Sequence, residues 1–288
     1  MHDAVRSMLD RYECRTRDDY VNALREILQQ VGLLGLWRSK FFEHAAFYGG
    51  TALRVLYGLN RYSEDLDFSL LKPDASFSLG PYGDALRREI GSFGFHVEFE
   101  SRPKTKAGPI ESAFLKANTY KLLIVIEAPD ELLRDLHPAK NLKIRLEVDT
   151  DPPGGFQTET QYLLLPIPFP VRVYCLPDLL AGKLHAILCR KWKTRVKGRD
   201  WYDLVWYAGR HPEVRISHLA SRMRQSGDYR EDGPLTPETL QNLLEQAVDT
   251  LDVDKARREV APFIKDRGTL DVWSPHFFRH IVKRIVPV

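Results

Sequence analysis

GGTALRVLYGLNRYSEDLDFSLL, residues 49–71, decides how the rest of the chain is interpreted. Asp65 and Asp67 stand two residues apart in a segment with the composition of a strand, so their side chains point to the same face of the pleat. Two carboxylates on one face suit Mg²⁺, which proteins hold with one or two carboxylates together with substrate phosphates. For an isolated pair of aspartates the plainer alternative is an acidic turn beside a half-buried strand.

The glycines upstream of the aspartates suggest a partner for such an ion. Gly49 and Gly50 would let the backbone approach a ligand closely, and Thr51 opens a segment, 52–57, that has the pattern of a short helix. The N-terminus of a helix offers free N–H groups and a positive dipole end, which suit phosphates.

The whole stretch resembles the signature of the polymerase-beta-type nucleotidyltransferases. In more detail it is similar to the AbiEii toxin family, including the MenT-type toxins, whose members carry GGT/S-A-L followed by R-x-S-x-D-x-D-F. The second motif is matched at the family spacing by Arg61, Ser63, Asp65, Asp67 and Phe68. The resemblance implies that the two aspartates are catalytic metal ligands and that the Gly49–Gly50–Thr51 turn and Ser63 bind the nucleotide.

Composition sets wider limits. With 288 residues, 43% of them hydrophobic, the chain can build one large or two medium domains. A net charge of +3 permits contact with nucleic acid without requiring it. Three cysteines without C-x-x-C spacing argue against a disulfide framework and a structural zinc site. Because the N-terminus lacks an apolar signal region and no run of eighteen apolar residues occurs, we expect a cytoplasmic protein without membrane contact.

Periodicity predicts the order of the elements. A helix is expected over 17–48, capped by Thr16 or Asp18, and a second over 82–93, while strands are expected over 95–100, 119–127 and 142–150. Proline-rich residues 151–170 read as a connection, and after a strand at 171–174 nearly everything has a helical pattern. We therefore expect an α+β fold: a polymerase-beta-like mixed sheet with helices in a core domain, 1–170, and a mostly helical domain, 171–288, which by resemblance completes the active site.

A third metal ligand is expected on the strand Lys143–Asp149. Alternation places Glu147 and Asp149 on its polar face, and either fits by position. The resemblance favours Glu147, because the family pattern here is close to K-I-x-E-V/I. A polar strand face that simply contacts water is the ordinary alternative.

Lys183 is the candidate for binding the triphosphate. It lies in a segment, Leu176–Leu188, with the pattern of a helix opened by Pro177, and falls off the apolar stripe of that helix. A lysine there can hold phosphates as a mobile point charge. AbiEii-like proteins carry K-L-x-A at this place, and the resemblance implies that the lysine is essential. Without the resemblance, Lys183 would be interpreted as a surface charge. His185 is interpreted as a hydrogen-bonded neutral imidazole.

A basic run, residues 190–199, follows that helix. Its cations, interleaved with Trp192, could follow a phosphodiester backbone and are predicted RNA contacts: Arg190, Lys191, Lys193, Arg195, Lys197 and Arg199. A solvated loop is the common alternative. The family element R-x-K-x-R-D-x-Y-D-L is matched here, and it implies that Asp200 and Asp203 orient the lysine, a base or the acceptor hydroxyl. Alone, they would read as helix-capping acids.

Taken together, the resemblance implies a type IV toxin. Such an enzyme would use Mg²⁺, with Mn²⁺ as the alternative ion, to move NMP from an NTP to the 3′ acceptor end of tRNA, which blocks translation. An AbiEi-like antitoxin encoded nearby would be expected, with no need for direct contact. Two alternatives stay open: modification of a small molecule or protein hydroxyl, and a non-catalytic nucleotide-binding module. The basic run favours RNA over a cationic aminoglycoside.

Overall fold

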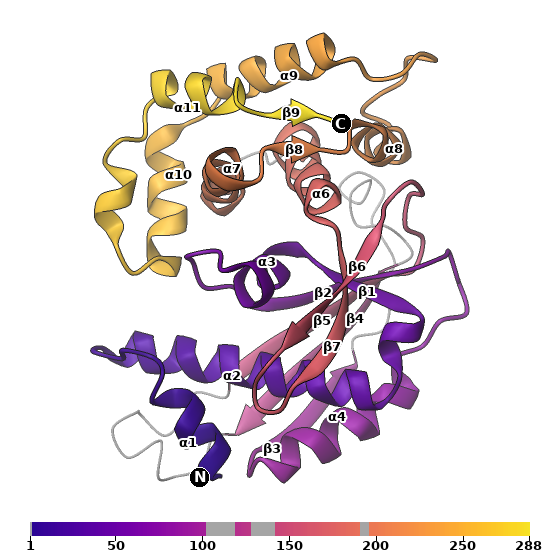
Figure 1. The fold of residues 1–288 in the computed structure, drawn as a ribbon, viewed down its shortest axis with the longest axis vertical. Helices are drawn as coiled ribbons and strands as arrows, with labels where there is room; N and C mark the ends of the chain where they lie inside the picture. Colours follow the sequence, from indigo (N-terminus) through magenta and orange to yellow (C-terminus); the bar gives the residue numbers. More distant parts are fainter. Residues whose placement is uncertain (1, 102–118, 128–141, 191–195) are drawn as a thin grey trace. The chain divides into compact units, whose positions relative to one another are not determined.

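The computed structural model describes residues 2–101, 119–127, 142–190 and 196–288 (Figure 1). The chain forms two compact units. Unit 1 consists of Met1–Gly58, Tyr62–Pro152 and Glu159–Val173, and unit 2 of Leu59–Arg61, Pro153–Thr158 and Tyr174–Val288. The chain therefore passes from one unit to the other more than once.

A seven-stranded mixed sheet forms the body of unit 1. Strand β2 lies in its middle, antiparallel to β1 and parallel to β5. In spatial order the strands are β3 (His96–Ser101), β4 (Thr119–Glu127), β5 (Leu142–Asp149), β2 (Asp65–Leu70), β1 (Ala45–Tyr48), β7 (Phe169–Tyr174) and β6 (Thr158–Leu163). This arrangement confirms the expected mixed sheet and places the two aspartates on a central strand.

Helices cover the apolar face of β2. The helices of unit 1 are α1 (Asp3–Leu9), α2 (Arg17–Arg38), α3 (Gly49–Tyr57) and α4 (Gly80–Ser92), with a 3₁₀ turn at Phe41–Glu43. Leu66 and Phe68 are fully buried. Gly32 of α2 is so close to this face that a Cβ atom on it would lie 3.8 Å from Leu66 Cδ1. The opposite face of the strand carries Asp65 and Asp67.

Three expectations for unit 1 need correction. The helix expected over 17–48 begins as predicted, with a capping box between Thr16 and Asp19, but ends at Arg38. Lys40, with φ 63°, takes a left-handed conformation that no helix continues through, and β1 follows at Ala45–Tyr48. Short apolar runs do not distinguish strand from helix by periodicity. Helix α3 includes both glycines, and the expected connection at 151–170 contains β6.

Unit 2 is mostly helical, as predicted. Its helices are α6 (Leu176–Cys189), α7 (Gly198–Arg210), α8 (Ile216–Ser226), α9 (Pro237–Asp249), α10 (Val253–Val260) and α11 (Pro275–Val282), with 3₁₀ turns at Ala261–Phe263 and Arg267–Leu270 and a parallel pair, β8 (Glu213–Val214) and β9 (Val286–Pro287). Thr236 caps α9, as expected. Helix α7 meets α10 so closely that a Cβ atom on Gly198 would lie 1.9 Å from Ala256 O. No helix among the described residues is long and apolar enough to cross a membrane.

Candidate active site

The D-x-D pair lies on one face of β2. Asp65 and Asp67 are partly exposed, whereas Leu66 and Phe68 between and after them are buried. The strand therefore presents its carboxylates away from the core that α2 and α4 cover. This is the arrangement that period-two alternation predicts.

The neighbouring strand adds a third carboxylate in register. Asp67 is the parallel partner of Glu147, and Ser69 is the partner of Asp149. Both acids of β5 share the face of Asp67, but their surroundings differ. The side chain of Glu147 is 24% exposed. Asp149 is buried and accepts a hydrogen bond from the backbone N–H of Asp151 at 3.1 Å.

A cation lies within this acidic face. Nη1 of Arg145 is 3.8 Å from Asp65 Oδ2 and 3.7 Å from Glu147 Oε1. Arg145 is the register partner of Asp65. The carboxylate oxygens of Asp65, Asp67 and Glu147 do not all lie within 4.8 Å of one another. The guanidinium thus balances part of their charge, and a bound ion would require the carboxylates to draw closer together.

The turn Gly49–Gly50–Thr51 contacts strand β2. Gly49 has φ +84°, and a Cβ atom on it would lie 2.5 Å from Asp67 Oδ2, so glycine is needed for conformation and for space. The hydroxyl of Thr51 donates a hydrogen bond to the carbonyl of Asp65. Gly50 and Thr51 are buried in the first turn of α3, which has no side-chain cap. Ser63 is half-buried, and its carbonyl accepts a hydrogen bond from Gln29 Nε2 at 3.1 Å.

Unit 2 brings the other predicted residues together. Lys183 Nζ on α6 lies 3.2 Å from Asp200 Oδ1 and 2.7 Å from Asp203 Oδ2 on α7. Asp203 also accepts two hydrogen bonds from Arg61, from Nε at 2.6 Å and from Nη2 at 2.7 Å. Arg61 and Asp203 are buried. The four side chains form a compact cluster of two cations and two anions, and both aspartates contact the lysine.

The charged side chains in and around this cluster shift one another's pKa values. Burial raises the pKa of Asp200, but Lys183, Arg190 and Lys197 outweigh it and lower that pKa to about 2. Burial alone would lower the pKa of Arg61, but the negative charge of Asp203 outweighs burial. The pKa of Arg61 is therefore raised above its ordinary value. Burial, together with the charge of Arg190, lowers the pKa of Lys197 to about 8.

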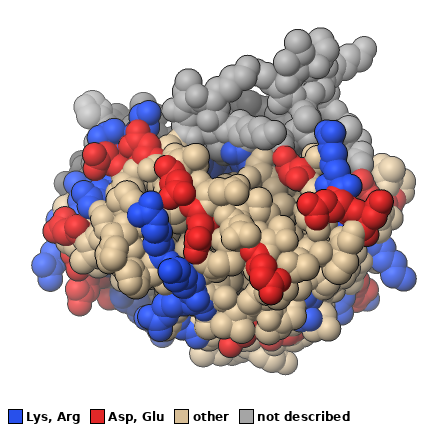
Figure 2. Space-filling model, turned by 90° about the horizontal axis from the view of Figure 1, so that it is seen from above, with Lys and Arg blue, Asp and Glu red and all other residues tan. Residues whose placement is uncertain are grey.

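The basic run is only partly described. Lys191, Lys193 and Arg195 lie outside the described residues. Arg190 is exposed at the end of α6. Arg199 forms an ion pair with Glu259 at 3.3 Å, and its guanidinium lies 4.3 Å from the centre of the Phe263 ring, so it supports packing within unit 2. On the face drawn in Figure 2, Lys and Arg side chains lie among Asp and Glu side chains. RNA binding by this run stays a prediction.

Two site residues were not identified from the sequence. Arg61 belongs to the R-x-S-x-D-x-D-F motif, yet nothing local indicates its pairing with Asp203, which lies 142 residues further on. Arg145 appears in the sequence only as a polar residue of an alternating strand. Its position between two carboxylates depends on the β2–β5 register.

Comparison with known proteins identifies a family and a fold for this chain. The family profile "Nucleotidyl transferase AbiEii toxin, Type IV TA system" matches residues 32–280. The fold is similar to that of MenT4, a nucleotidyltransferase toxin from Mycobacterium tuberculosis H37Rv, with a TM-score of 0.56, 19% identity and coverage of 98% of this chain and 88% of that one. JHP933 from Helicobacter pylori gives a TM-score of 0.52 and 16% identity, with 92% and 91% covered.

A search of curated proteins found no match. At such low identities the two solved structures support the fold alone, which is the predicted mixed α+β fold of nucleotidyltransferases. The profile, by contrast, spans most of the chain and all the motifs described above. The chain therefore belongs to the AbiEii nucleotidyltransferase toxin family of type IV toxin–antitoxin systems.

Proposed function

We propose that this toxin is a metal-dependent enzyme that transfers NMP from an NTP to the 3′ acceptor end of tRNA. The observation that carries the proposal is the shared face of β2 and β5. On this face Asp67 lies beside its register partner Glu147, and Asp65 lies two residues before Asp67 on β2. Three carboxylates grouped on a partly exposed face, away from the core, suit a divalent ion and a charged substrate.

The residues fit Mg²⁺, with Mn²⁺ as the alternative. All three side chains offer oxygen ligands, which both hard ions prefer. Asp65, Asp67 and Glu147 would hold the ion, and Glu147 is preferred to Asp149 because the latter is buried and already bonded to Asp151. When bound, the metal would neutralise the charge that develops on the phosphates during transfer.

The glycine turn would position the nucleotide beside these carboxylates. Because Gly49 has no side chain, the Asp67 carboxylate lies directly against the first turn of α3, whose N–H groups would face the phosphates. The hydrogen bond from Thr51 to the carbonyl of Asp65 fixes the turn relative to the strand. Ser63 remains the further nucleotide contact that the family motif implies.

Lys183 would bind the triphosphate as a point charge. Its ammonium group is held by Asp200 and Asp203, and Arg61 in turn holds Asp203. A side chain with two fixed partners loses little further freedom when it binds, which favours a defined position. In this proposal the core domain, 1–170, supplies the metal site and the helical domain, 171–288, supplies the lysine.

Family membership and charge support the proposed acceptor and partner. The basic run at 190–199 suits an RNA backbone better than a cationic small molecule. An AbiEi-like antitoxin encoded nearby is the expected partner. An enzyme that modifies tRNA would act in the cytoplasm.

One experiment tests the assignment. The purified protein is incubated with total tRNA, Mg²⁺ and each labelled NTP in turn, beside the Asp67→Ala variant and an Asp149→Ala control on the same sheet face. Label in tRNA from one NTP, lost in Asp67→Ala and retained in Asp149→Ala, is the expected result. Label in protein or in a small molecule would replace tRNA as the substrate. The absence of label in every fraction would favour a nucleotide-binding module without catalysis.

A further inference from the structure

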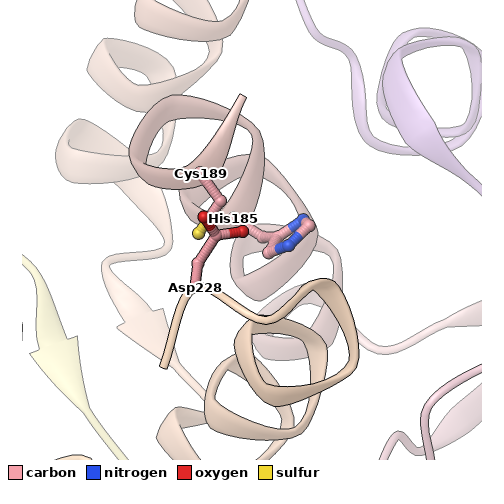
Figure 3. Close-up of side chains that lie close together, drawn as sticks. All are labelled: His185, Cys189 and Asp228. Carbon is pink, nitrogen blue, oxygen red and sulfur yellow. The ribbon is translucent and has the colours of Figure 1, made fainter. Parts of the chain in front are cut away.

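Three potential metal ligands meet on the far side of α6 from Lys183. His185 and Cys189 are one helical turn apart on α6, and Asp228 follows α8 (Figure 3). One ligand atom from each of the three lies within 4.8 Å of the others. His185 follows Lys183 by two positions, which is roughly 200° around a helix, so the cluster faces away from the lysine.

The surroundings hold these side chains in place. Cys189 is buried, with 1% exposure, and His185 and Asp228 are half-buried. Asp228 sits in the C-terminal cap of α8: Gly227 has φ 78°, and the backbone N–H of Asp228 donates to Met223 O at 2.9 Å. His185 and Cys189 thus stand on the last turns of α6, and the backbone hydrogen bond to Met223 ties Asp228 to the end of α8.

A serine hydroxyl links two of the three groups. Ser226 Oγ lies 3.0 Å from His185 Nε2 and donates to Asp228 Oδ2 at 2.6 Å. Metal-binding histidines and carboxylates commonly have such an outer partner, which fixes their orientation. The hydroxyl is therefore suitably placed to support both ligands.

We propose that His185, Cys189 and Asp228 bind one zinc ion, with water as the fourth ligand. A thiolate, an imidazole and a carboxylate form a donor set that suits Zn²⁺ and excludes Mg²⁺ and Ca²⁺, which prefer oxygen alone. Zinc bonds of about 2.0–2.3 Å in a tetrahedron place ligand atoms roughly 3.5 Å apart, so the side chains, now within 4.8 Å of one another, must close by at most about 1 Å. On binding, the thiol of Cys189 gives up its proton to solvent, and the thiolate forms the bond to zinc.

This site was not expected from the sequence. The absence of C-x-x-C spacing predicts that there is no structural zinc site, but this argument covers only sites built on paired cysteines. Here the pair is His185 and Cys189, four positions apart, and the third ligand lies 39 residues beyond Cys189. The ion would clamp the last turn of α6 to the end of α8, and so stabilise unit 2 just before the basic run. It would take no part in nucleotide transfer.

The full-length protein is stripped with a chelator and titrated with Zn²⁺ against a colorimetric indicator, and separately with Co²⁺ followed by visible absorption. We expect one ion per chain, a thiolate-to-cobalt charge-transfer band, and a thermal midpoint that zinc raises. Cys189→Ser and Asp228→Asn should lose the band and the zinc-dependent shift. Cys14→Ser, which removes a thiol elsewhere, should keep both, and circular dichroism confirms that each variant is folded.

Two further variants sharpen the outcome. Ser226→Ala should retain the band but weaken zinc affinity by about 10–100-fold, as loss of an outer partner does. Asp67→Ala should bind zinc unchanged, which separates this site from the carboxylates on β2. If zinc fails to bind at one per chain, or binds equally well to Cys189→Ser, the proposal is overturned and the cluster is a hydrogen-bonded packing contact.

Discussion

Gly49 and Asp67 lie so close together that a Cβ atom on the glycine would come within 2.5 Å of the carboxylate oxygen. Gly49→Ala should therefore displace Asp67 and abolish nucleotide transfer, in addition to straining a backbone with φ +84°. Gly58→Ala is the matched control: its φ is +74°, but nothing lies within 4 Å of the added Cβ.

Both variants should lose about 1–2 kcal/mol from backbone strain, measured by denaturant unfolding. Only Gly49→Ala should also lose transfer of labelled nucleotide to tRNA. Equal activity in the two variants would mean that the contact with Asp67 does not matter for the reaction.

The third carboxylate can be assigned by substitution. Glu147 is the register partner of Asp67, so Glu147→Gln should lower kcat/KM by more than about 100-fold, because even an outer partner of a metal ligand is worth 10–100-fold. Asp149→Asn should retain most activity. Both variants are measured by nucleotide transfer across a range of Mg²⁺ concentrations. A larger loss of activity in Asp149→Asn than in Glu147→Gln would make Asp149 the third metal ligand.

Burial should decide how much each Arg–Asp pair contributes to stability. Arg61 and Asp203 are 2.6 Å apart and buried, whereas Arg87 and Asp84 are also 2.6 Å apart but exposed. Asp203→Asn should lower the free energy of unfolding by about 3–5 kcal/mol, because it leaves the buried Arg61 without its anion and the partly buried Lys183 with one partner fewer. Asp84→Asn should cost about 1 kcal/mol or less. Similar losses in chemical denaturation would contradict the ionic cluster.

Acid should lower the stability of unit 2 by protonating Asp200. Its pKa is about 2 in the folded protein and near 3.8 when unfolded, so its charged form stabilises the fold above about pH 4. That contribution should fall away between about pH 4 and pH 2, as the unfolded chain takes up the proton first. Lys183→Met removes an attracting charge and should flatten this dependence, measured by urea unfolding at several pH values. An unchanged slope would argue against the Lys183–Asp200 contact.

Lys197 should titrate near neutrality. Its pKa of about 8 lies below the ordinary 10.5, because the side chain is partly buried and lies near other cations, Arg190 foremost. The unfolded chain binds this proton between these pH values and the folded chain does not, so stability should rise with pH through that window. Competitive acylation read by mass spectrometry should give a midpoint near pH 8, which returns to the ordinary value in denaturant. A folded-state midpoint near 10.5 would contradict the burial.

Local periodicity determined what could be predicted from the sequence. The shared face of Asp65 and Asp67 follows from the two-residue repeat of any strand, and the cap of α9 from the Thr236–Pro237 pair. The run 39–48 was misjudged, because its apolar residues fit either period and the left-handed turn at Lys40 has no sequence signal.

Relationships between distant residues could not be predicted in this way. The pairing of Asp67 with Glu147 depends on a strand register that is set by tertiary packing. The same is true of Arg145, and of Arg61 with its partner 142 residues away. Family motifs named most of the candidate residues, but only the fold shows which of them contact one another.

The assignment of Leu59–Arg61 to unit 2 constrains how such toxins can be recombined. A gene fragment that encodes only residues 174–288 would lack Arg61 and leave Asp203 with a single cation in a buried position. A truncated toxin that begins at Tyr174 should therefore express poorly, whereas exchange of the C-terminal half between relatives that carry the arginine of R-x-S-x-D-x-D-F should keep the pair. The two units alternate along the chain, so neither can be expressed whole as one uninterrupted segment.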